Sequence, residues 1–234
     1  MIKDLVSQVS SGNDLSPHDM SNAMNEILNG TQNDQDIANF LKNLAQKGES
    51  DDELLAMLNK MEEFAIHISP NCQGKVIDVC GTGGDKLKTF NISTAASFVI
   101  AAAGGNVAKH GNRSMSGISG SADIFEYFGF DLNSEPMKVN ETIEKFGIGF
   151  MFAQKFHPSM KYAMPTRKEL GFKTIFNNLG PLTNPANCKY LMIGVPDIDT
   201  GNKMSNALRI LNKTALVVHG MEGLDEASIL GDTY

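Results

Sequence analysis

From residue 76 onward the chain alternates short apolar runs with helical patterns, and this alternation constrains its fold more than any other feature. We expect strands at 76–80, 107–108, 148–152, 191–195 and 216–219. Helical patterns separate them, near residues 92–103, 121–128, 136–146 and 201–212. Strand, loop, helix and strand in repetition is typical of an α/β fold with a mostly parallel central sheet. In such sheets ligands bind at the carboxyl ends of the strands.

The first third of the chain is different, because its apolar residues recur at helical spacing throughout. Ser16-Pro17 and Ser50, each followed by acidic residues, are typical helix starts. Such stripes predict a plain helical core, and no catalytic residue is expected before residue 70. A linker at Ser69-Pro70-Asn71 separates the two patterns. We therefore predict a small all-helical domain at 1–68 and a larger α/β domain at 69–234.

Composition excludes several classes of protein. Twenty Lys and Arg against 27 Asp and Glu leave a net charge of −7, which argues against a nucleic-acid surface. No apolar run reaches the roughly 18–20 residues of a membrane span. The polar start of the chain is not typical of a signal peptide. Three cysteines without metal-ligand spacing predict reduced thiols and a cytoplasmic location.

The glycine-rich segment Gly81-Thr82-Gly83-Gly84-Asp85 directly follows the predicted strand at 76–80. Glycines let a backbone approach a ligand and turn its N–H groups toward an anion. Hydroxyls and an amide at 89–94 stand at the start of a helix, whose terminus also favours phosphate. The segment has neither the lysine of a Walker loop nor the spacing of a dinucleotide loop, so a different phosphate ester and an ordinary tight turn both stay open.

Three further polar clusters follow predicted strands. Lys109-His110-Gly111-Asn112-Arg113-Ser114 follows the second strand, 157–167 lies beyond the third, and Asp225-Glu226 follows the last. Adjacent carboxylates supply the oxygen ligands that Mg²⁺ prefers. Each cluster taken singly is also compatible with a solvated surface loop.

Long segments in one order carry a resemblance to a known family: GTGGD at 81–85, TFNIST at 89–94, VAKHGNR at 107–113, GSAD at 120–123, HPSMKYAMPTRKELGFKTIFNNLGPLTNPA at 157–186 and HGMEGLDE at 219–226. On these segments the chain resembles the anthranilate phosphoribosyltransferase family along its whole length. The resemblance implies a small helical domain joined to a larger α/β domain, and homodimers formed through the helical part. Family members continue well past the Asp-Glu motif, so we expect this chain to lack the C-terminal part of the α/β domain.

The resemblance also implies an activity: transfer of the phosphoribosyl group of 5-phosphoribosyl 1-diphosphate (PRPP) to the amine of anthranilate, releasing pyrophosphate, in tryptophan biosynthesis. It implies Mg²⁺ held by Ser93, Asp225 and Glu226, and anthranilate contacts at Gly81, Asn112 and Arg167. The implied PRPP-binding residues are Gly81, Gly84, Asp85, Thr89, Asn91, Ile92, Ser93, Thr94, Lys109, His110, Gly111, Asn112, Arg113, Ser114, Met115, Ser116, Gly117 and Ser121.

The chemistry of these residue types agrees with those roles. PRPP is a polyanion, so an acidic protein needs local N–H donors, Lys109 and metal ions to hold it. Metal ions would stabilise charge on the departing pyrophosphate. Arg167 can grip the anthranilate carboxylate with two parallel hydrogen bonds. No covalent nucleophile is needed, and Cys80 is expected to be a small core residue.

The segment at 114–117 departs from the family pattern, with Met115 and Gly117 where small residues and a serine are common. Two other functions remain open for this fold. One is nucleic-acid binding, which would need a basic stripe that the net charge opposes. The other is a pyrimidine nucleoside phosphorylase, against which the Lys-His-Gly-Asn-Arg loop and Arg167 argue.

Overall fold

The computed structural model describes residues 2–83, 87, 89–114, 119–172 and 174–234. These residues form two compact units. The first unit comprises Met1–Ala65 and His157–Thr183, and the second comprises Ile66–Phe156 and Asn184–Tyr234. The predicted fold class, a helical domain joined to a larger α/β domain, is confirmed. The exact division at residues 68 and 69 stays a prediction.

The first unit begins with the four helices that the apolar stripes predict: α1 (Ile2–Ser10), α2 (Pro17–Leu28), α3 (Asp34–Lys47) and α4 (Asp51–Glu63). The side chains of Ser16, Asn33 and Ser50 cap α2, α3 and α4 by accepting hydrogen bonds from backbone N–H groups in the first turn. Helix α1 packs on α3, and α2 packs on α4. The stripes face inward, and side chains such as Met24 and Phe40 are fully buried.

A segment distant in sequence completes this unit with short helices: η1 (Pro158–Tyr162), α9 (Met164–Leu170), α10 (Ile175–Leu179) and η2 (Gly180–Leu182). The hydroxyl of Thr166 on α9 lies 3.5 Å from the backbone oxygen of Asp34. The ring of Tyr162 lies so close to Gly30 that a Cβ there would meet it at 2.5 Å. The sequence predicted no helices here, because helices this short depend on tertiary contacts.

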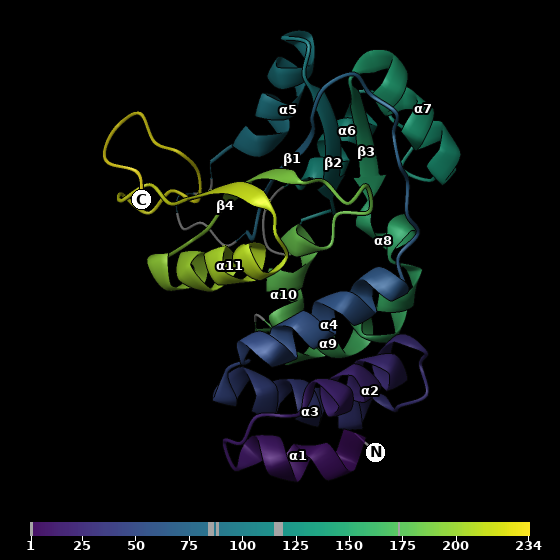
Figure 1. Cartoon of the computed structure of the whole chain (residues 1–234), viewed down its shortest axis with the longest axis vertical. Helices are drawn as coiled ribbons and strands as arrows, with labels where there is room; N and C mark the ends of the chain where they lie inside the picture. The colour runs from purple at the N-terminus through teal and green to yellow at the C-terminus, as the bar shows by residue number, and fades with distance from the viewer. Residues whose placement is uncertain (1, 84–86, 88, 115–118, 173) are drawn as a thin grey trace. The chain divides into compact units, whose positions relative to one another are not determined.

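The second unit is built on a five-stranded sheet of order β3-β2-β1-β4-β5, and all of its pairs are parallel (Figure 1). The strands are β1 (Val76–Gly81), β2 (Asn106–Gly111), β3 (Ile148–Phe152), β4 (Tyr190–Gly194) and β5 (Thr214–Val218). Each strand overlaps one of the five predicted segments, and at least one of its two ends lies within two residues of the predicted end. The prediction of a mostly parallel sheet is confirmed.

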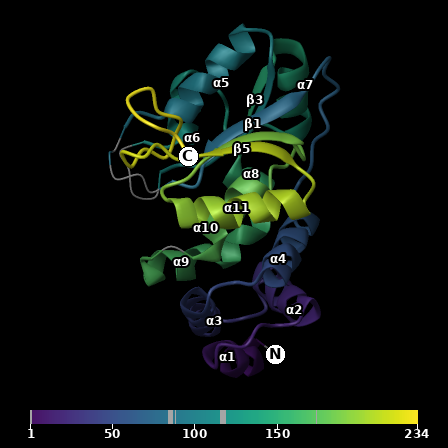
Figure 2. The same cartoon turned by 60° about the vertical axis from the view of Figure 1, so that its left-hand side comes forward.

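Helices cover both faces of this sheet: α5 (Ile92–Ala102), α6 (Ser121–Tyr127), α7 (Pro136–Phe146), α8 (Ala153–Phe156) and α11 (Ile198–Ile210). Val107 and Phe150 pack toward α5 and α6, while the next residues along their strands, Ala108 and Met151, pack toward α7. This alternation follows the two-residue period of a strand. Figure 2 shows α5 and α11 on opposite sides of the strands.

None of the helices that the described residues form is both long and apolar enough to cross a lipid bilayer.

Candidate active site

The carboxyl edge of the sheet collects most of the polar segments that the sequence predicts. Strand β1 runs into the glycine loop after Gly81, and β2 runs into the loop after Gly111. Strand β5 ends at Val218, shortly before Asp225 and Glu226. Because all five strands are parallel, these segments leave the sheet at one edge.

Ser93 and the two acidic residues meet at this edge. The backbone N–H of Ser93, in the first turn of α5, donates to Glu226 Oε1 at 3.1 Å. A carboxylate at a helix N-terminus is stabilised by the unpaired N–H groups and the helix dipole. A Cβ built on Gly81 would lie 3.7 Å from Asp225 Oδ2. The predicted metal ligands Ser93, Asp225 and Glu226 therefore lie around the ends of β1 and α5.

Glycine is required at Gly194 by the backbone of the acidic segment. A Cβ on Gly194 would lie 1.7 Å from the backbone oxygen of Asp225, which no packing adjustment of a side chain could relieve. The backbone oxygen of Gly194 accepts from the N–H of Thr82 at 3.0 Å. The segment that follows β1 and the acidic segment that follows β5 thus both contact the end of β4 at Gly194.

Lys109 points from β2 toward the same place and is only 2% exposed. Its ammonium donates to the backbone oxygen of Val79 and lies 3.5 Å from Ser93 Oγ. Burial lowers the pKa of Lys109, although the negative charges of Asp78 and Glu226 oppose that shift. The ammonium of Lys109 therefore lies beside Ser93, where the charge of Glu226 acts on it.

The loop after β2 is closed on itself by tight backbone packing. A Cβ on Gly111 would meet Ser121 Oγ at 2.2 Å, and one on Gly120 would meet the N–H of Ser114 at 2.3 Å. The backbone oxygen of Asn112 accepts from the N–H of Ala122 at 3.2 Å. These contacts leave no room for side chains at Gly111 and Gly120. The two ends of the loop therefore lie close together at the start of α6.

Arg113 is bound to acidic side chains of α6. Its guanidinium forms ion pairs with Asp123 at 2.5 Å and Glu126 at 2.8 Å. The hydrogen bonds that Arg113 donates to Glu126 and Asp123 raise its pKa. The pKa of Glu126 is lowered by Arg113, and that of Asp123 is lowered first by the N–H of Gly120 and then by Arg113. The predicted PRPP contact at Arg113 is therefore already engaged by two carboxylates.

Other predicted residues lie at the start of α5. Asn91 Nδ2 donates to the backbone oxygen of Ser119 at 3.3 Å, so Asn91 links the first glycine loop to the loop after β2. Thr94 is buried, and its hydroxyl has no hydrogen-bond partner among the described residues. His110 is buried at the end of β2, whereas Thr89 is exposed and Ile92 is half-buried. Five predicted site residues lie outside the described part of the chain: Gly84, Asp85, Met115, Ser116 and Gly117.

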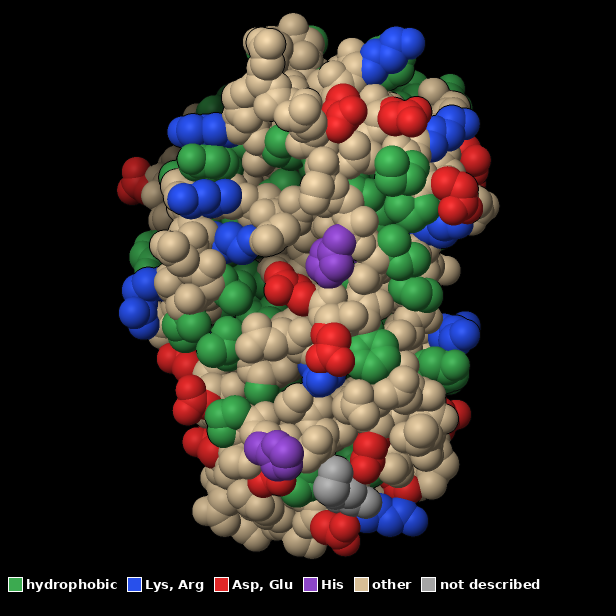
Figure 3. Space-filling view, turned by 45° about the vertical axis from the view of Figure 1, so that its right-hand side comes forward, with side chains coloured by type: hydrophobic (Ala, Val, Ile, Leu, Met, Phe, Trp, Pro, Cys, Tyr) green, Lys and Arg blue, Asp and Glu red, His purple; other side chains and the backbone are tan. Residues whose placement is uncertain are grey.

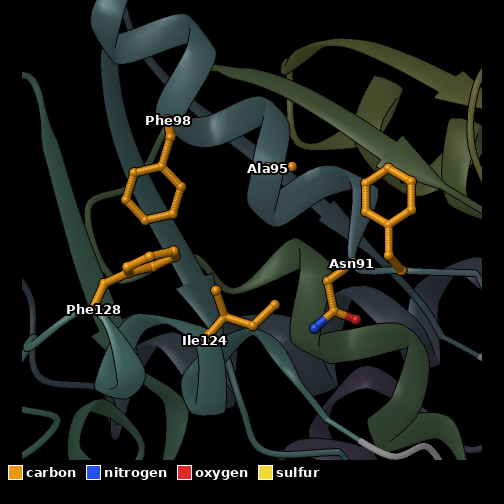
Figure 4. A pocket seen from close by; sticks show the side chains of 6 residues that line it. Asn91, Ala95, Phe98, Ile124 and Phe128 are labelled. Carbon is orange, nitrogen blue, oxygen red and sulfur yellow. The ribbon is translucent and has the colours of Figure 1, made fainter.

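A cavity of about 400 Å³ lies between residues of α5 and residues at the end of α6 (Figure 4). Its lining is almost wholly apolar: Phe90, Asn91, Ala95, Phe98, Ile124 and Phe128. Asn91 is the polar side chain in this lining. The cavity does not offer the cationic groups and N–H donors that a polyanion requires.

Arg167 belongs to the first unit, on α9. Its guanidinium lies 3.5 Å from Asn177 Oδ1 and 5.4 Å from the centre of the Phe176 ring. Burial lowers its pKa. No carboxylate of the described residues pairs with it. A half-buried guanidinium without an anionic partner is a good receptor for a ligand carboxylate.

The donors at the edge suit Mg²⁺. Two carboxylates and a hydroxyl are hard oxygen ligands of the kind Mg²⁺ selects, and it usually keeps several of its waters. The described residues contain no cluster of three or more His, Cys, Asp or Glu side chains arranged around a metal position. The hydroxyl of Ser93 and the carboxylates of Asp225 and Glu226 are nevertheless oxygen donors compatible with Mg²⁺.

Two buried residues of this region were missed by the sequence reasoning. Asp78 is fully buried in β1, and Asn184 is 6% exposed. The signal for Asp78 was available, because a carboxylate inside the apolar run Val-Ile-Asp-Val-Cys needs a buried partner. Cys80 is buried, as predicted, and burial raises its pKa well above the ordinary value, so it is held as a thiol.

Comparison with known proteins matches both units to one family. The α/β domain of a glycosyl transferase family matches residues 73–234, and the helical bundle domain of a glycosyl transferase family matches residues 3–65. The chain is 55% identical over 229 residues to the anthranilate phosphoribosyltransferase of Nitrosopumilus maritimus (strain SCM1), covering 97% of this chain and 66% of that protein.

Solved structures agree. A crystal structure of anthranilate phosphoribosyltransferase from Thermus thermophilus is 41% identical with a TM-score of 0.89, covering 97% of this chain and 68% of that one. The Saccharomyces cerevisiae enzyme in complex with PRPP and Mg is 25% identical with a TM-score of 0.89, covering 99% and 69%. The chain spans about two thirds of the length of these relatives. It belongs to the anthranilate phosphoribosyltransferase family.

Proposed function

We propose that this protein transfers the phosphoribosyl group of PRPP to the amine of anthranilate, with Mg²⁺ as cofactor and pyrophosphate as the leaving group. The observation that carries the proposal is the meeting of Lys109, Ser93 and Glu226 at the carboxyl edge of a parallel sheet. Membership of the family supports it, as does the S. cerevisiae relative solved with PRPP and Mg. The reaction belongs to tryptophan biosynthesis.

The chain's own residues bind and orient PRPP. Backbone N–H groups of the glycine loop and of the α5 N-terminus donate to its phosphate oxygens, and Lys109 adds a buried positive charge. Ser93, Asp225 and Glu226 would hold Mg²⁺, which when bound stabilises negative charge on the pyrophosphate. The loop after β2, from Lys109 to Ser114 with Ser121, completes the predicted PRPP contacts. The predicted contacts that are not described, at 84–85 and 115–117, belong to the same proposal.

Arg167 is assigned to the carboxylate of anthranilate, with Gly81 and Asn112 as further predicted contacts. Its guanidinium lacks a carboxylate partner among the described residues, so a ligand carboxylate would complete it. An aromatic amine is neutral at pH 7, so its nitrogen can bond to C1 of the ribose as the C1–O bond to pyrophosphate breaks, and the proton that it then loses passes to the pyrophosphate or to water. The rate enhancement then comes from orientation and electrostatics rather than from a covalent intermediate.

The proposal extends to assembly and location. We propose homodimers through the helical domain, a domain division at residues 68 and 69, and a cytoplasmic location. Sedimentation equilibrium checks the first of these, and a monomer at all concentrations would contradict it.

The test of the activity is the loss of anthranilate fluorescence when the folded protein is mixed with PRPP and Mg²⁺. We expect the loss to require all three, and to be abolished by EDTA. Glu226→Gln keeps the shape of the side chain but removes its charge, and it should lower the rate about 10²-fold or more. Unchanged fluorescence with a folded parent protein would reject the proposed activity.

The two alternatives have less support. Figure 3 shows Lys and Arg side chains scattered over one face among Asp and Glu side chains, rather than gathered into a stripe. Salt-sensitive retention on DNA would nevertheless favour the nucleic-acid alternative. Phosphate-dependent cleavage of thymidine would favour a nucleoside phosphorylase.

A further inference from the structure

The backbone ladder between β1 and β2 is short. Among the described residues, β1 pairs with β2 at Val76–Asn106 and Ile77–Val107, whereas β2 pairs with β3 over five positions. Beyond Ile77 and Val107, β1 still pairs with β4 and β2 with β3, but the backbone groups by which β1 and β2 face each other need other partners, because buried N–H and C=O groups are costly to leave unpaired.

Three side chains supply those partners, and we call them the polar wedge: Asp78, Lys109 and Asn184. Asp78 Oδ1 accepts from the N–H of His110 at 3.3 Å. Asn184 Nδ2 donates to the backbone oxygen of Ala108 at 2.9 Å, and Lys109 Nζ donates to that of Val79. The polar wedge therefore bonds to the backbone of both strands beyond the point where their ladder ends.

The polar wedge is also bonded within itself and is buried. Asn184 Nδ2 donates to Asp78 Oδ2 at 2.7 Å, and Asn184 Oδ1 accepts from the N–H of Ala186 at 2.8 Å. Asp78 is 0% exposed, Lys109 2% and Asn184 6%. Burial raises the pKa of Asp78, while the positive charge of Lys109 and the hydrogen bond from Asn184 oppose that rise. Asp78 and Lys109 thus stabilise each other's charged forms.

We propose that Asp78 and Asn184 are positioning residues for diphosphate binding: they hold Lys109 between β1 and β2 so that its ammonium reaches Ser93 at the carboxyl edge of the sheet. This inference rests on the proposed function, because it takes the diphosphate group of PRPP as the anion. Neither residue touches the ligand. They act through Lys109, whose long side chain would otherwise lose much conformational freedom on binding.

The polar wedge explains why a charged network occupies a sheet interior where apolar residues would pack well. Replacing a buried ion pair by apolar residues is often neutral for stability, so stability alone does not require this one. A lysine held in place in advance binds a polyanion without a further ordering cost. The polar wedge holds Lys109 Nζ at 3.5 Å from Ser93 Oγ.

Calorimetric titration with inorganic pyrophosphate, with and without Mg²⁺, tests the inference separately from turnover. Asp78→Asn keeps the shape of the side chain and removes its charge, and we expect the pyrophosphate dissociation constant to rise at least tenfold. Asn184→Ser keeps Asp78 charged but removes the two hydrogen bonds that Nδ2 donates, to Asp78 and to the backbone oxygen of Ala108, and we expect the pyrophosphate dissociation constant to rise about threefold to fivefold. In both variants the KM for PRPP should rise while the KM for anthranilate stays unchanged.

The matched control is Ile143→Val, a buried substitution of the same unit that lies outside the polar wedge. It should lower the thermal midpoint while leaving the pyrophosphate dissociation constant within twofold. If Asp78→Asn binds pyrophosphate within twofold of the parent, or if Ile143→Val weakens binding as much, the positioning role is wrong. Should Asp78→Asn fail to fold, Asn184→Ser decides by the same criterion. A folded parent that does not bind pyrophosphate would overturn the proposed function itself.

Discussion

Each of the two units buries a carboxylate close to a lysine, and the two pairs differ in how the charges are satisfied. In the helical unit Glu53 is 0% exposed and lies 2.7 Å from the ammonium of Lys47. In the sheet unit Asp78 is equally buried, and Lys109 donates to the backbone of the same strand. One pair lies at a helix start, and the other lies beside the proposed diphosphate site.

The helical pair is satisfied by its own unit. Glu53 accepts from the N–H groups of Leu15 and Ser50, each at 2.8 Å, and closes the capping box of α4. Lys47 pairs with Asp14 as well as with Glu53. Although burial by itself lowers the pKa of Lys47, hydrogen bonds to Asp14 and Glu53 outweigh it and raise that pKa. The cation therefore has no need of a ligand.

In the sheet pair, the surrounding groups offset less of the cost of burying the lysine's positive charge. Burial dominates at Lys109 and lowers its pKa, even though Asp78 and Glu226 attract its charge. Its neighbour at the edge is the hydroxyl of Ser93. The same two residue types thus give an ion pair satisfied within the unit where two carboxylates bond the lysine, and the proposed anion-binding group where no carboxylate of the described residues does.

The largest expected effect comes from breaking the helical pair. Lys47→Met leaves Glu53 buried without its cation, and removing one partner of a buried pair costs about 3 kcal/mol of unfolding free energy or more. Urea denaturation measures the loss. Turnover of the folded fraction should be unchanged, and a variant as stable as the parent would show that Glu53 is satisfied by its N–H donors alone.

The same substitution in the sheet unit should have the opposite profile. Lys109→Met removes the buried charge from the edge, and we expect kcat/KM for PRPP to fall about 10²–10³-fold, as for the loss of one electrostatic donor. The thermal midpoint should fall less than in Lys47→Met, because burial lowers the pKa of Lys109 whereas the pKa of Lys47 is raised, so folding favours the charge of Lys109 less than that of Lys47. Equal losses of stability in Lys47→Met and Lys109→Met would contradict the view that the helical pair stabilises the fold more than the sheet pair does.

A third effect concerns the acidic segment. Gly194→Ala places a Cβ against the backbone of Asp225, and overpacking of this kind costs about 1–3 kcal/mol. The Mg²⁺ concentration for half-maximal activity should rise, because Asp225 and Glu226 are displaced. Gly201→Ala on α11 is the control, since its Cβ would meet only side chains, at 3.3 Å or more, and should change stability by about 1 kcal/mol or less. Similar behaviour of both variants would contradict the tight fit at Gly194.

The smallest effect is on alkaline stability. The folded-state pKa of Lys47 is raised above its unfolded value of about 10.4. Its contribution to stability is therefore fully present below that value and is lost as the pH rises through the folded pKa. Urea midpoints compared between pH 9 and pH 12 should fall more steeply for the parent than for Lys47→Met. Parallel curves would show that Lys47 contributes no pH-dependent stability.

Local patterns predicted most of the secondary structure. The helices of the first 65 residues follow from apolar stripes, with starts at Ser16 and Ser50, and the strands follow from apolar runs, three of which end at glycine. The helices between Pro158 and Leu182 were not predicted, because each is short, and η1 and α9 pack against the distant helices α2 and α3. Tertiary contacts, rather than periodicity, stabilise that segment.

The candidate site shows the same limit. The meeting of Ser93 with Glu226 could be expected, since both follow parallel strands. The engagement of Arg113 by Asp123 and Glu126 could not, because it depends on the path of the loop after β2.

By itself, then, the order of residues determined a helical unit, a parallel sheet and the edge at which its polar loops emerge, since each depends on spacing along the chain. Only the tertiary structure decided which of two buried lysines is neutralised by its neighbours. The bonds that settle this join residues as far apart as Asp78 and Asn184, and hydrogen-bond geometry over such a separation exists only once the chain has folded.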